Sequence, residues 1–356
     1  MKILFTFYNP SGGMETLNRT RCKALIEHGV DCHLLYKFNG FGLPNSKHIP
    51  TLICSDFTRI AQFVKKEQFD AIIVCTDYEL LASLREGGYQ GPIVYEMQGL
   101  GDLQTANSII NRAKPSVCAH ATAILSPKTS HLINIAKKEF PAKPFFCFDN
   151  PVDSTHFHYR RYPPKSHPIL AWVGRIEANK NWLDFVQIGH QLSHRIPDLR
   201  LWMFSDQSLF EPEEKLKFEQ KIQELQLEHK LIRYSYLPHE QMSDYFSIIG
   251  DSGGLLCSTS VMEGFGYAVA EAMLCHCPVL STDSDGVRNF IIPHKTGMFY
   301  SRGNINQAVE LAYRIMNNRA LRNKLRKRGE RYIQTRFACR KYVNQFTAML
   351  RKLVTG

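Results

Sequence analysis

The sequence has no uncharged run approaching the ~20 apolar residues that a membrane-spanning helix requires. Its apolar start, residues 1–7, reaches Tyr8-Asn9-Pro10 before a signal-peptide core of useful length can form, and no small-residue cleavage site follows. This start therefore predicts a first β-strand, and we expect a chain that does not cross a bilayer.

Cysteine pairs at redox or metal spacing are also absent. The ten cysteines contain no CxxC motif, and Cys275-His276-Cys277 is their one cluster. A zinc site would need further ligands at recognisable spacing, so this cluster favours small buried core residues over a metal site. Scattered thiols in a long chain are typical of a reducing compartment, so we expect a cytoplasmic protein without a disulfide framework.

Acidic residues are nearly missing from residues 314–352. This segment holds thirteen Lys and Arg against one acid, Glu330, so its net charge is +12. Because the whole chain has a net charge of +11, the rest of the chain sums to about −1. Two uses of this charge stay open: a solvated helix face, or a surface that attaches peripherally to an anionic membrane on its inner face. Nucleic acid is disfavoured as a partner because no recognised nucleic-acid-binding module accompanies the charge.

The composition is that of a folded chain with two domains. Hydrophobic residues make up 44% and charged residues 22% of 356 residues, which disfavours a disordered or fibrous chain. At roughly 150 residues per domain, this length predicts two domains. Short β-rich apolar runs alternate with helical stretches, as in βαβ units that feed a parallel sheet.

The expected elements fall into two series separated by a proline-rich connection. In the first series we expect strands at 3–7, 30–36, 71–75, 92–95, 121–125 and 145–148, and helices at 14–28, 59–66 and 127–138. In the second we expect strands at 169–174, 199–204, 231–234, 255–258 and 279–281, and helices at 182–192, 211–225, 240–249 and 267–274. Helical segments at 305–316, at 320–335 and around Val343 to Leu353 end the chain. The connection that begins Asn150-Pro151-Val152-Asp153 predicts domains at 1–150 and 151–335, followed by a C-terminal helix within 336–356.

The segment from Glu263 to Glu271 carries the clearest chemical signal. Gly264 and Gly266 let the backbone approach a ligand closely, and a helix that begins near Tyr267 offers free N–H groups and a positive dipole end to a phosphate. The two glutamates are eight positions apart, at most about 12 Å along a helix axis, so each can engage one end of a nucleotide sugar. The alternative is a glycine turn with a solvated Glu, but Glu271 lies among apolar residues, where an unpaired carboxylate is costly to bury.

Two further segments follow predicted strands. Gly174-Arg175 and Lys180-Asn181 place two cations five positions apart after a buried strand, where they can converge on a diphosphate; a surface pair is the equal alternative. Gly12-Gly13 follow the first strand without the GxGxxG pattern of dinucleotide-binding folds. They offer backbone amides to a phosphate or a sugar, or they only make the turn.

Taken together, these segments resemble the retaining nucleotide-sugar glycosyltransferases of the GT-B fold, specifically glycosyltransferase family four. The resemblance is strongest over residues 150–297. It implies an α/β fold of two Rossmann-like, doubly wound domains that face each other across a cleft, with the acceptor mainly on the N-terminal domain and the donor on the C-terminal one. It also implies C-terminal helices that return to the N-terminal domain.

The same resemblance implies a role for each matching residue. Arg175 and Lys180 would bind the donor diphosphate and stabilise the leaving group, and Glu271 would hold the ribose hydroxyls. Glu263 would hold the donor sugar's hydroxyls, and with Arg175 and Lys180 it completes the expected catalytic set. The remaining expected donor-binding residues are Gly12, Gly13, Gln98, Gly264, Phe265, Gly266 and Tyr267.

Two departures from the family pattern affect these expectations. Gln98 takes the place of a His that often contacts the donor sugar, and an amide can donate a hydrogen bond but cannot titrate near neutral pH. The family's Gly-Gly-x-x-Glu loop appears as Asp285-Gly286-Val287-Arg288-Asn289, which puts the role of that loop in doubt.

Asp283-Ser284-Asp285 is formally a metal-bridging D-x-D motif, but Arg175, Lys180 and a helix end already serve the phosphates, so we expect no metal and no cofactor.

The resemblance predicts a hexosyltransferase that moves a hexosyl or N-acetylhexosaminyl unit from a nucleoside diphosphate sugar to a hydroxyl with retained configuration. A UDP-sugar is the expected donor, and a glycan, a glycolipid or a small molecule is the acceptor, in cell-surface glycan or glycolipid synthesis. Two alternatives stay open. One is another GT-B enzyme, such as a nucleotide-sugar epimerase or a sugar phosphorylase; the other is a membrane- or nucleic-acid-binding protein that uses the basic segment.

Overall fold

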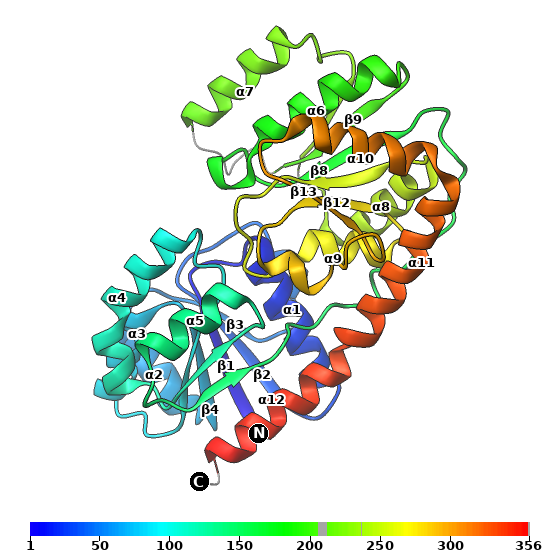
Figure 1. Cartoon of the computed structure of the whole chain (residues 1–356). Helices are drawn as coiled ribbons and strands as arrows, with labels where there is room; N and C mark the ends of the chain where they lie inside the picture. The colour runs from blue at the N-terminus through cyan, green and yellow to red at the C-terminus, as the bar shows by residue number, and fades with distance from the viewer. Residues whose placement is uncertain (206–211, 236, 355–356) are drawn as a thin grey trace. The chain divides into compact units, whose positions relative to one another are not determined.

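The computed structural model describes residues 1–205, 212–235 and 237–354. The chain forms two compact units, one built from Met1–Val152 together with Phe337–Gly356 and the other from Asp153–Arg336 (Figure 1). Each unit contains one parallel sheet covered by helices on both faces. No helix among the described residues combines the length and the apolar character that crossing a membrane would need.

The sheet of the first unit has seven strands in the order β3-β2-β1-β4-β5-β6-β7. All of its neighbouring strands pair in parallel. The strands are β1 Lys2–Phe7, β2 Asp31–Tyr36, β3 Thr51–Ile53, β4 Ala71–Cys75, β5 Ile93–Glu96, β6 Ala123–Ser126 and β7 Phe145–Cys147. Because β4 is apolar at every position, its five residues are buried on both faces, as expected of a central parallel strand.

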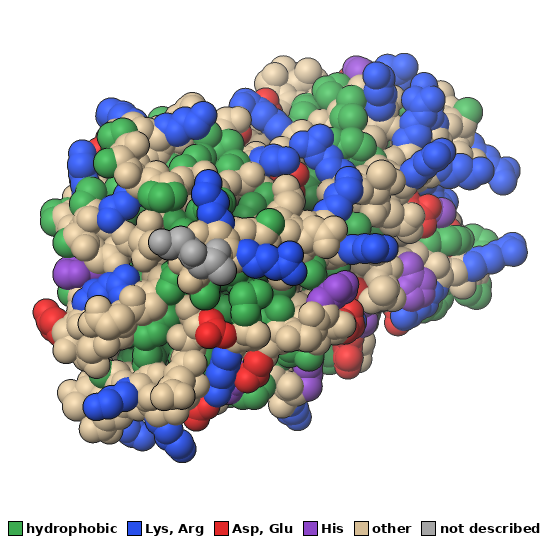
Figure 2. Space-filling view, turned by 90° about the horizontal axis from the view of Figure 1, so that it is seen from below, with side chains coloured by type: hydrophobic (Ala, Val, Ile, Leu, Met, Phe, Trp, Pro, Cys, Tyr) green, Lys and Arg blue, Asp and Glu red, His purple; other side chains and the backbone are tan. Residues whose placement is uncertain are grey.

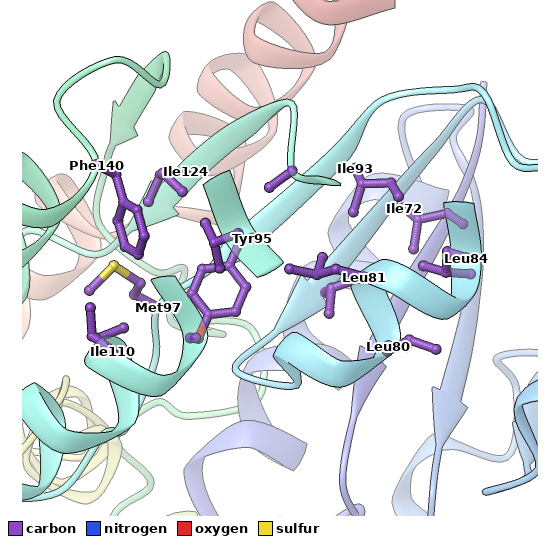
Figure 3. Packing of buried hydrophobic residues seen from close by; sticks show 14 of the residues in the cluster. Ile72, Leu80, Leu81, Leu84, Ile93, Tyr95, Met97, Ile110, Ile124 and Phe140 are labelled. Atoms are coloured by element: carbon purple, nitrogen blue, oxygen red, sulfur yellow. The ribbon is translucent and has the colours of Figure 1, made fainter. Parts of the chain in front are cut away.

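Helices of the first unit divide between the two faces of this sheet. Helices α2 Phe57–Glu67, α3 Tyr78–Glu86, α4 Leu103–His120 and α5 Ser130–Glu139 cover one face, and α1 Gly12–Ile26 and α12 Cys339–Val354 cover the other. Figure 3 shows the leucines of α3 lying against Ile72 and Ile93 of the sheet. On the opposite face, Phe346 of α12 packs on Phe5 with ring centroids 5.5 Å apart. The last helix of the chain therefore belongs to the first unit.

The sheet of the second unit has six strands in the order β10-β9-β8-β11-β12-β13. They are β8 Ile169–Val173, β9 Arg200–Phe204, β10 Leu231–Tyr234, β11 Leu255–Ser258, β12 Val279–Thr282 and β13 Met298–Tyr300. Its helices are α6 Trp182–Arg195, α7 Pro212–Glu224, α8 Met242–Asp251, α9 Tyr267–Leu274, α10 Ile305–Asn317 and α11 Arg319–Arg336. Helices α6, α7 and α10 share one buried cluster with the sheet, while α8 and α9 contact strands β8, β11 and β12.

The predicted α/β class, with two parallel sheets and C-terminal helices, is confirmed. The predictions for single elements missed β3 and β13, which have three residues each, and the helices α3 and α4. Helix α4 contains Pro115 in its interior, a residue that normally breaks a helix and so hid it in the sequence. Glu211, the predicted start of α7, lies outside the described residues.

Candidate donor site at the end of strand β8

The chain leaves β8 through Gly174 and forms a short 3₁₀ turn, Ala178–Lys180, before α6. Gly174 is needed here, because a Cβ atom would lie 2.8 Å from the Trp172 ring and 3.2 Å from the Lys180 side chain. Asn181 then takes a left-handed φ of 48° as the residue before α6. The turn places Lys180 at the carboxyl edge of the sheet, where parallel α/β sheets bind ligands.

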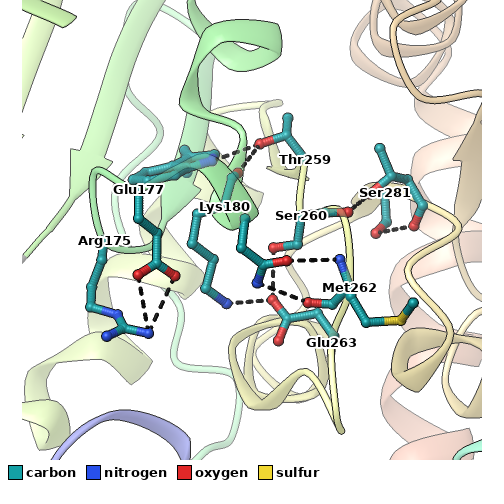
Figure 4. A network of polar contacts seen from close by, with 11 residues as sticks. Arg175, Glu177, Lys180, Thr259, Ser260, Met262, Glu263 and Ser281 are labelled. Atoms are coloured by element: carbon teal, nitrogen blue, oxygen red, sulfur yellow. Dashed lines mark hydrogen bonds and ion pairs between the residues drawn. The ribbon is translucent and has the colours of Figure 1, made fainter. Parts of the chain in front are cut away.

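Lys180 and Glu263 meet in the structure although 83 positions separate them. Lys180 Nζ lies 2.5 Å from Glu263 Oε1, and the two side chains are 21% and 17% exposed (Figure 4). The Ser260 hydroxyl donates to the same carboxylate oxygen at 2.7 Å. Thr259 Oγ1 donates to the Lys180 carbonyl at 2.8 Å, which ties the turn to the end of β11. The ammonium and the carboxylate are thus held side by side at the surface of the second unit.

Arg175 points to a different partner. Its Nη2 atom lies 3.2 Å from the Glu177 carboxylate, and its side chain is 55% exposed. Figure 4 shows this pair beside the Lys180–Glu263 pair. The structure therefore brings Lys180 and Glu263 together but does not show the two predicted cations converging.

The glycine-rich segment after Glu263 starts helix α9. Gly266 has a φ of 92°, a conformation that a glycine adopts without strain, and it precedes Tyr267 as the first helical residue. Phe265 and Tyr267 are 5% and 9% exposed, and Phe265 packs on Phe290 with centroids 4.8 Å apart. Their rings are therefore part of the core, and what this segment presents to a ligand is backbone.

Glu271 lies on α9 and is 4% exposed. Its Oε1 atom is 3.1 Å from Nε2 of His239, an ion-pair distance, but Oε1 has no aligned hydrogen-bond partner among the described residues. His239 also contacts the Phe157 ring at a centroid distance of 5.0 Å. No sequence motif pointed to His239, because only the fold brings it next to α9. A buried carboxylate oxygen without an aligned hydrogen bond is costly unless a ligand supplies a donor.

The loop after β12 holds the backbone of Glu263. Glu263 N–H donates to the Ser284 carbonyl at 2.8 Å, and Gly286 N–H donates to the Glu263 carbonyl at 3.1 Å. Asp285 has a φ of 64° although it is not a glycine. The Arg288 side chain binds Asp283 at 2.6 and 3.0 Å and lies 3.5 Å from Asp285, so both carboxylates of the D-x-D motif face a guanidinium. No group of three His, Cys, Asp or Glu suited to a metal occurs in the described part of the chain.

The other predicted donor-binding residues lie in the first unit. Gly12 has a φ of 55° and begins α1, with Gly13 as the next helical residue. Gln98 is 4% exposed; its amide nitrogen donates to Glu96 at 3.2 Å and to Asn150 at 2.9 Å, and its oxygen accepts from Asn150 at 3.1 Å. Both of its N–H groups therefore have internal partners. The donor contacts of Gly12, Gly13 and Gln98 remain predictions.

Comparisons with known proteins bear on the family and the fold of the chain. Residues 157–332 match the family model described as glycosyl transferases group 1. The trehalose synthase of Thermococcus litoralis is 22% identical over 185 residues, which is 51% of this chain and 44% of that protein. The chain thus matches less than half the length of this curated relative.

Solved structures match over nearly the whole chain. Sucrose-phosphate synthase from Thermosynechococcus elongatus has a TM-score of 0.84 at 17% identity and covers 100% of this chain and 99% of its own. HepE of Anabaena, solved in complex with UDP-glucose, has a TM-score of 0.84 at 15% identity and covers 99% of this chain and 100% of its own.

The two parallel sheets and these structural matches define the fold as GT-B. The chain belongs to the glycosyl transferases group 1 family, glycosyltransferase family four, as the resemblance in the sequence indicated.

Proposed function

We propose that the chain transfers a sugar from a nucleoside diphosphate sugar to a hydroxyl acceptor with retained anomeric configuration, and that the donor carries UDP. Family membership supports the reaction class, and the likeness to HepE, solved with UDP-glucose, supports the choice of uridine. The observation that carries the proposal is the buried Glu271 carboxylate with an oxygen that lacks a hydrogen-bond partner among the described residues. Two ribose hydroxyls provide donors for such an oxygen.

In this proposal, Lys180 and Glu263 act at the two sides of the bond that breaks. The Lys180 ammonium and the Arg175 guanidinium stabilise the negative charge that develops on the leaving diphosphate. Glu263 accepts hydrogen bonds from hydroxyls of the donor sugar, and the N–H groups at the start of α9 face the phosphates. As the bond from C1 to the phosphate oxygen breaks, the acceptor oxygen bonds C1 on the same face and its proton passes to the departing phosphate. We propose that this reaction uses no metal, because these cations already serve the diphosphate.

A thermal-shift panel tests the donor class. UDP, GDP, ADP and their glucose conjugates are added without metal to the wild type, to Lys180→Ala and to Glu271→Ala. Lys217→Ala is the matched control, because Lys217 is an exposed lysine of the same unit paired with Glu214 at 2.8 Å. We expect saturable stabilisation of the wild type and of the control by UDP compounds, as required of a ligand that binds the folded state, and its loss in the two site variants. An absence of any nucleotide shift in the wild type would contradict the proposal.

We also propose that helix α11 attaches the protein peripherally to an anionic membrane. Four exposed cations lie on one face of this helix, because Lys324 and Arg331 are each three and four positions away from the adjacent pair Lys327 and Arg328. The acid in this helix, Glu330, is 2.6 Å from His276 and so is engaged elsewhere. Figure 2 shows one side of the molecule, with Lys and Arg side chains spread over it and scattered Asp and Glu.

A further inference from the structure

The strand order of the first unit creates a second place where a ligand can bind. The chain runs from β1 through α1 to β2 on one side of the sheet, and from β4 through α3 to β5 on the other. Helices α1 and α3 cover opposite faces, so they diverge where β1 and β4 lie next to each other. In open parallel sheets, a crevice forms at the carboxyl ends of such a strand pair. Tyr8 follows β1 there, Lys37 follows the neighbouring β2, and Thr76-Asp77 follow β4.

Asp77 is a buried carboxylate that is only half satisfied. The residue is 3% exposed, and its Oδ2 lies 2.7 Å from Nζ of Lys37. Its Oδ1 is buried and has no hydrogen-bond partner among the described residues. Asp77 precedes α3 at the N-cap position, yet its side chain makes no capping hydrogen bond. Aspartate commonly caps a helix from this position; here the Leu80 N–H is near enough to lower the pKa of the carboxyl but makes no aligned hydrogen bond, and Oδ1 has no partner among the described residues.

The backbone before Asp77 is strained. Thr76 has a φ of 59°, although β-branched residues rarely adopt this conformation. Asp77 N–H donates to the Cys75 carbonyl at 2.8 Å, which closes a tight three-residue turn, and Thr76 N–H donates to the Glu96 carbonyl at 3.1 Å. Strain of this kind persists where the surroundings fix it, and it gathers at binding and catalytic sites. Here it fixes the direction in which the chain leaves β4 and so the position of Asp77.

Aromatic rings border this ion pair. Lys37 Nζ lies 5.6 Å from the ring centroid of Tyr8 and 5.0 Å from that of Phe57, and both residues are 37% exposed. Burial and the neighbouring Asp77 raise the pKa of Tyr8 to about 12, so its hydroxyl is a donor at neutral pH. Glu79 is 3.9 Å from Lys37 Nζ and 66% exposed. One ammonium beside two carboxylates gives the cluster a charge of −1, which disfavours an anionic ligand.

We propose that Tyr8, Lys37, Phe57 and Asp77 form the acceptor subsite and that it takes a neutral, polyhydroxylated, carbohydrate-type acceptor. Asp77 Oδ1 accepts a hydrogen bond from an acceptor hydroxyl, Lys37 donates to a neighbouring one, and the rings of Tyr8 and Phe57 pack on the C–H face of the sugar. This assignment rests on the proposed function, because it names the acceptor class of that reaction. The resemblance to the family assigned none of these four residues.

The test measures binding of methyl α-D-glucopyranoside and of glucose 6-phosphate by saturation-transfer NMR, with UDP present. The chain offers a matched control in Lys2 and Glu67, a lysine–carboxylate pair 2.5 Å apart at the opposite end of β1. We expect the wild type and Glu67→Gln to bind the neutral glycoside, and Asp77→Asn to bind it at least tenfold more weakly, as loss of a hydrogen bond to a charged group implies. Tyr8→Leu keeps the ion pair and is expected to weaken binding of the glycoside as well. This variant replaces Asp77→Asn in the test if Asp77→Asn does not fold.

Three outcomes would overturn the assignment: equal affinity of Asp77→Asn and the wild type for the glycoside, tighter binding of glucose 6-phosphate than of the glycoside, or no binding of either probe to the wild type. The proposed function fails separately. If UDP does not bind the wild type but glycoside binding depends on Asp77, the donor assignment is wrong and the subsite stands. If UDP binds and Asp77→Asn changes nothing, the subsite is wrong and the donor assignment stands.

Discussion

At the scale of single residues, the two glutamates of the second unit differ in how their charge is balanced. Glu263 has a lysine and a hydroxyl on one carboxylate oxygen, so its charge is compensated before any ligand arrives. Glu271 is more deeply buried and faces His239 without an aligned hydrogen bond. A ligand that donates to Glu271 therefore removes a desolvation cost, while one that binds Glu263 must share it with Lys180.

Glu271→Gln tests the ribose role of this carboxylate. We expect UDP to bind this variant about 10- to 100-fold more weakly, because a hydrogen bond to a charged group contributes about 1.5–3 kcal/mol. 2′,3′-Dideoxy-UDP lacks the hydroxyl donors, so its affinity should be nearly equal for variant and wild type. Isothermal titration calorimetry with both nucleotides measures this, and Glu224→Gln, an exposed glutamate of the same unit, is the control. Equal losses for the two nucleotides would argue against ribose recognition.

The burial of Asp77 leads to a prediction about how the stability of the fold depends on pH. Burial raises the pKa of its carboxyl, with Lys37 opposing the shift, so ionisation of Asp77 costs folding free energy. The folded protein then holds this proton more tightly than the unfolded chain, and the associated stability is present below the ordinary Asp pKa of about 3.9 and lost as pH rises through the raised value. We therefore expect Asp77→Asn to melt at a higher temperature than the wild type at pH 7, with a smaller difference near pH 4. Melting curves at both pH values decide this, and a less stable variant at pH 7 would show that the Lys37 pair outweighs burial.

At the scale of elements, a buried ion pair joins helix α1 to strand β5. Arg21 is 0% exposed, and its Nη1 lies 2.8 Å from each oxygen of Glu96, while Nη2 donates to Asn18 at 2.6 Å. The Phe5 ring lies 4.0 Å beneath the guanidinium. Gln98 extends the network from Glu96 to Asn150, next to the end of the first chain segment of this unit. The pair fixes α1, whose first residues are Gly12 and Gly13, against the sheet.

Breaking this pair should be costly. Glu96→Leu leaves a buried guanidinium without its counter-charge, and we expect a loss of about 3–5 kcal/mol in the free energy of unfolding of the first unit. Arg21→Met combined with Glu96→Leu removes both charges and should recover much of that loss. Urea unfolding followed by the signals of the first unit measures Glu96→Leu, Arg21→Met and the double variant. If the double variant loses the sum of the two single losses, the pair does not act as a unit.

The sequence predicted elements where local pattern and burial agree. Residues 71–75, 231–234, 255–258 and 267–274 were predicted with the bounds that the structure shows, because each is a mainly apolar run flanked by polar residues or glycines. Short strands such as β3 have too few residues to show a hydrophobic period, and α3 begins with a polar turn.

In the candidate site, the spacing of Glu263 and Glu271 was visible along the chain. The pairing of Arg21 with Glu96, of Lys37 with Asp77 and of His239 with Glu271 was not, because each joins residues at least 30 positions apart through the fold.

At the scale of the whole molecule, the positive charge is concentrated in one segment near the end of the sequence, and the rest of the chain is almost neutral. The net charge of the chain is +11; residues 314–352 carry +12, and all other residues together carry −1. Several of these cations are used inside the fold: Arg326 binds Asp251 at 2.7 Å, and Arg322 donates to the carbonyls of Ile315 and Met316. Exposed cations of α11, and others on α12 such as Arg340 and Lys341, remain at the surface, where they can act on a partner. Charge of this kind attracts anionic surfaces over about one Debye length, so its effect must depend on salt.

Reversal of the α11 charges tests its use on a membrane. The variant carries Glu at Lys324, Lys327, Arg328 and Arg331; the control carries Glu at four exposed lysines of the first unit, Lys65, Lys66, Lys137 and Lys138, and has the same net charge. Since each cation near an anionic surface contributes about 1 kcal/mol, we expect the α11 variant to bind vesicles with 30% phosphatidylserine at least about 100-fold more weakly than the control does. Flotation at 0.1 and 0.5 M salt measures this, and the wild type should lose binding at the higher salt. If both variants lose binding equally, net charge and not the face of α11 drives attachment. If the wild type binds a single-stranded oligonucleotide more tightly than these vesicles, the basic segment serves nucleic acid.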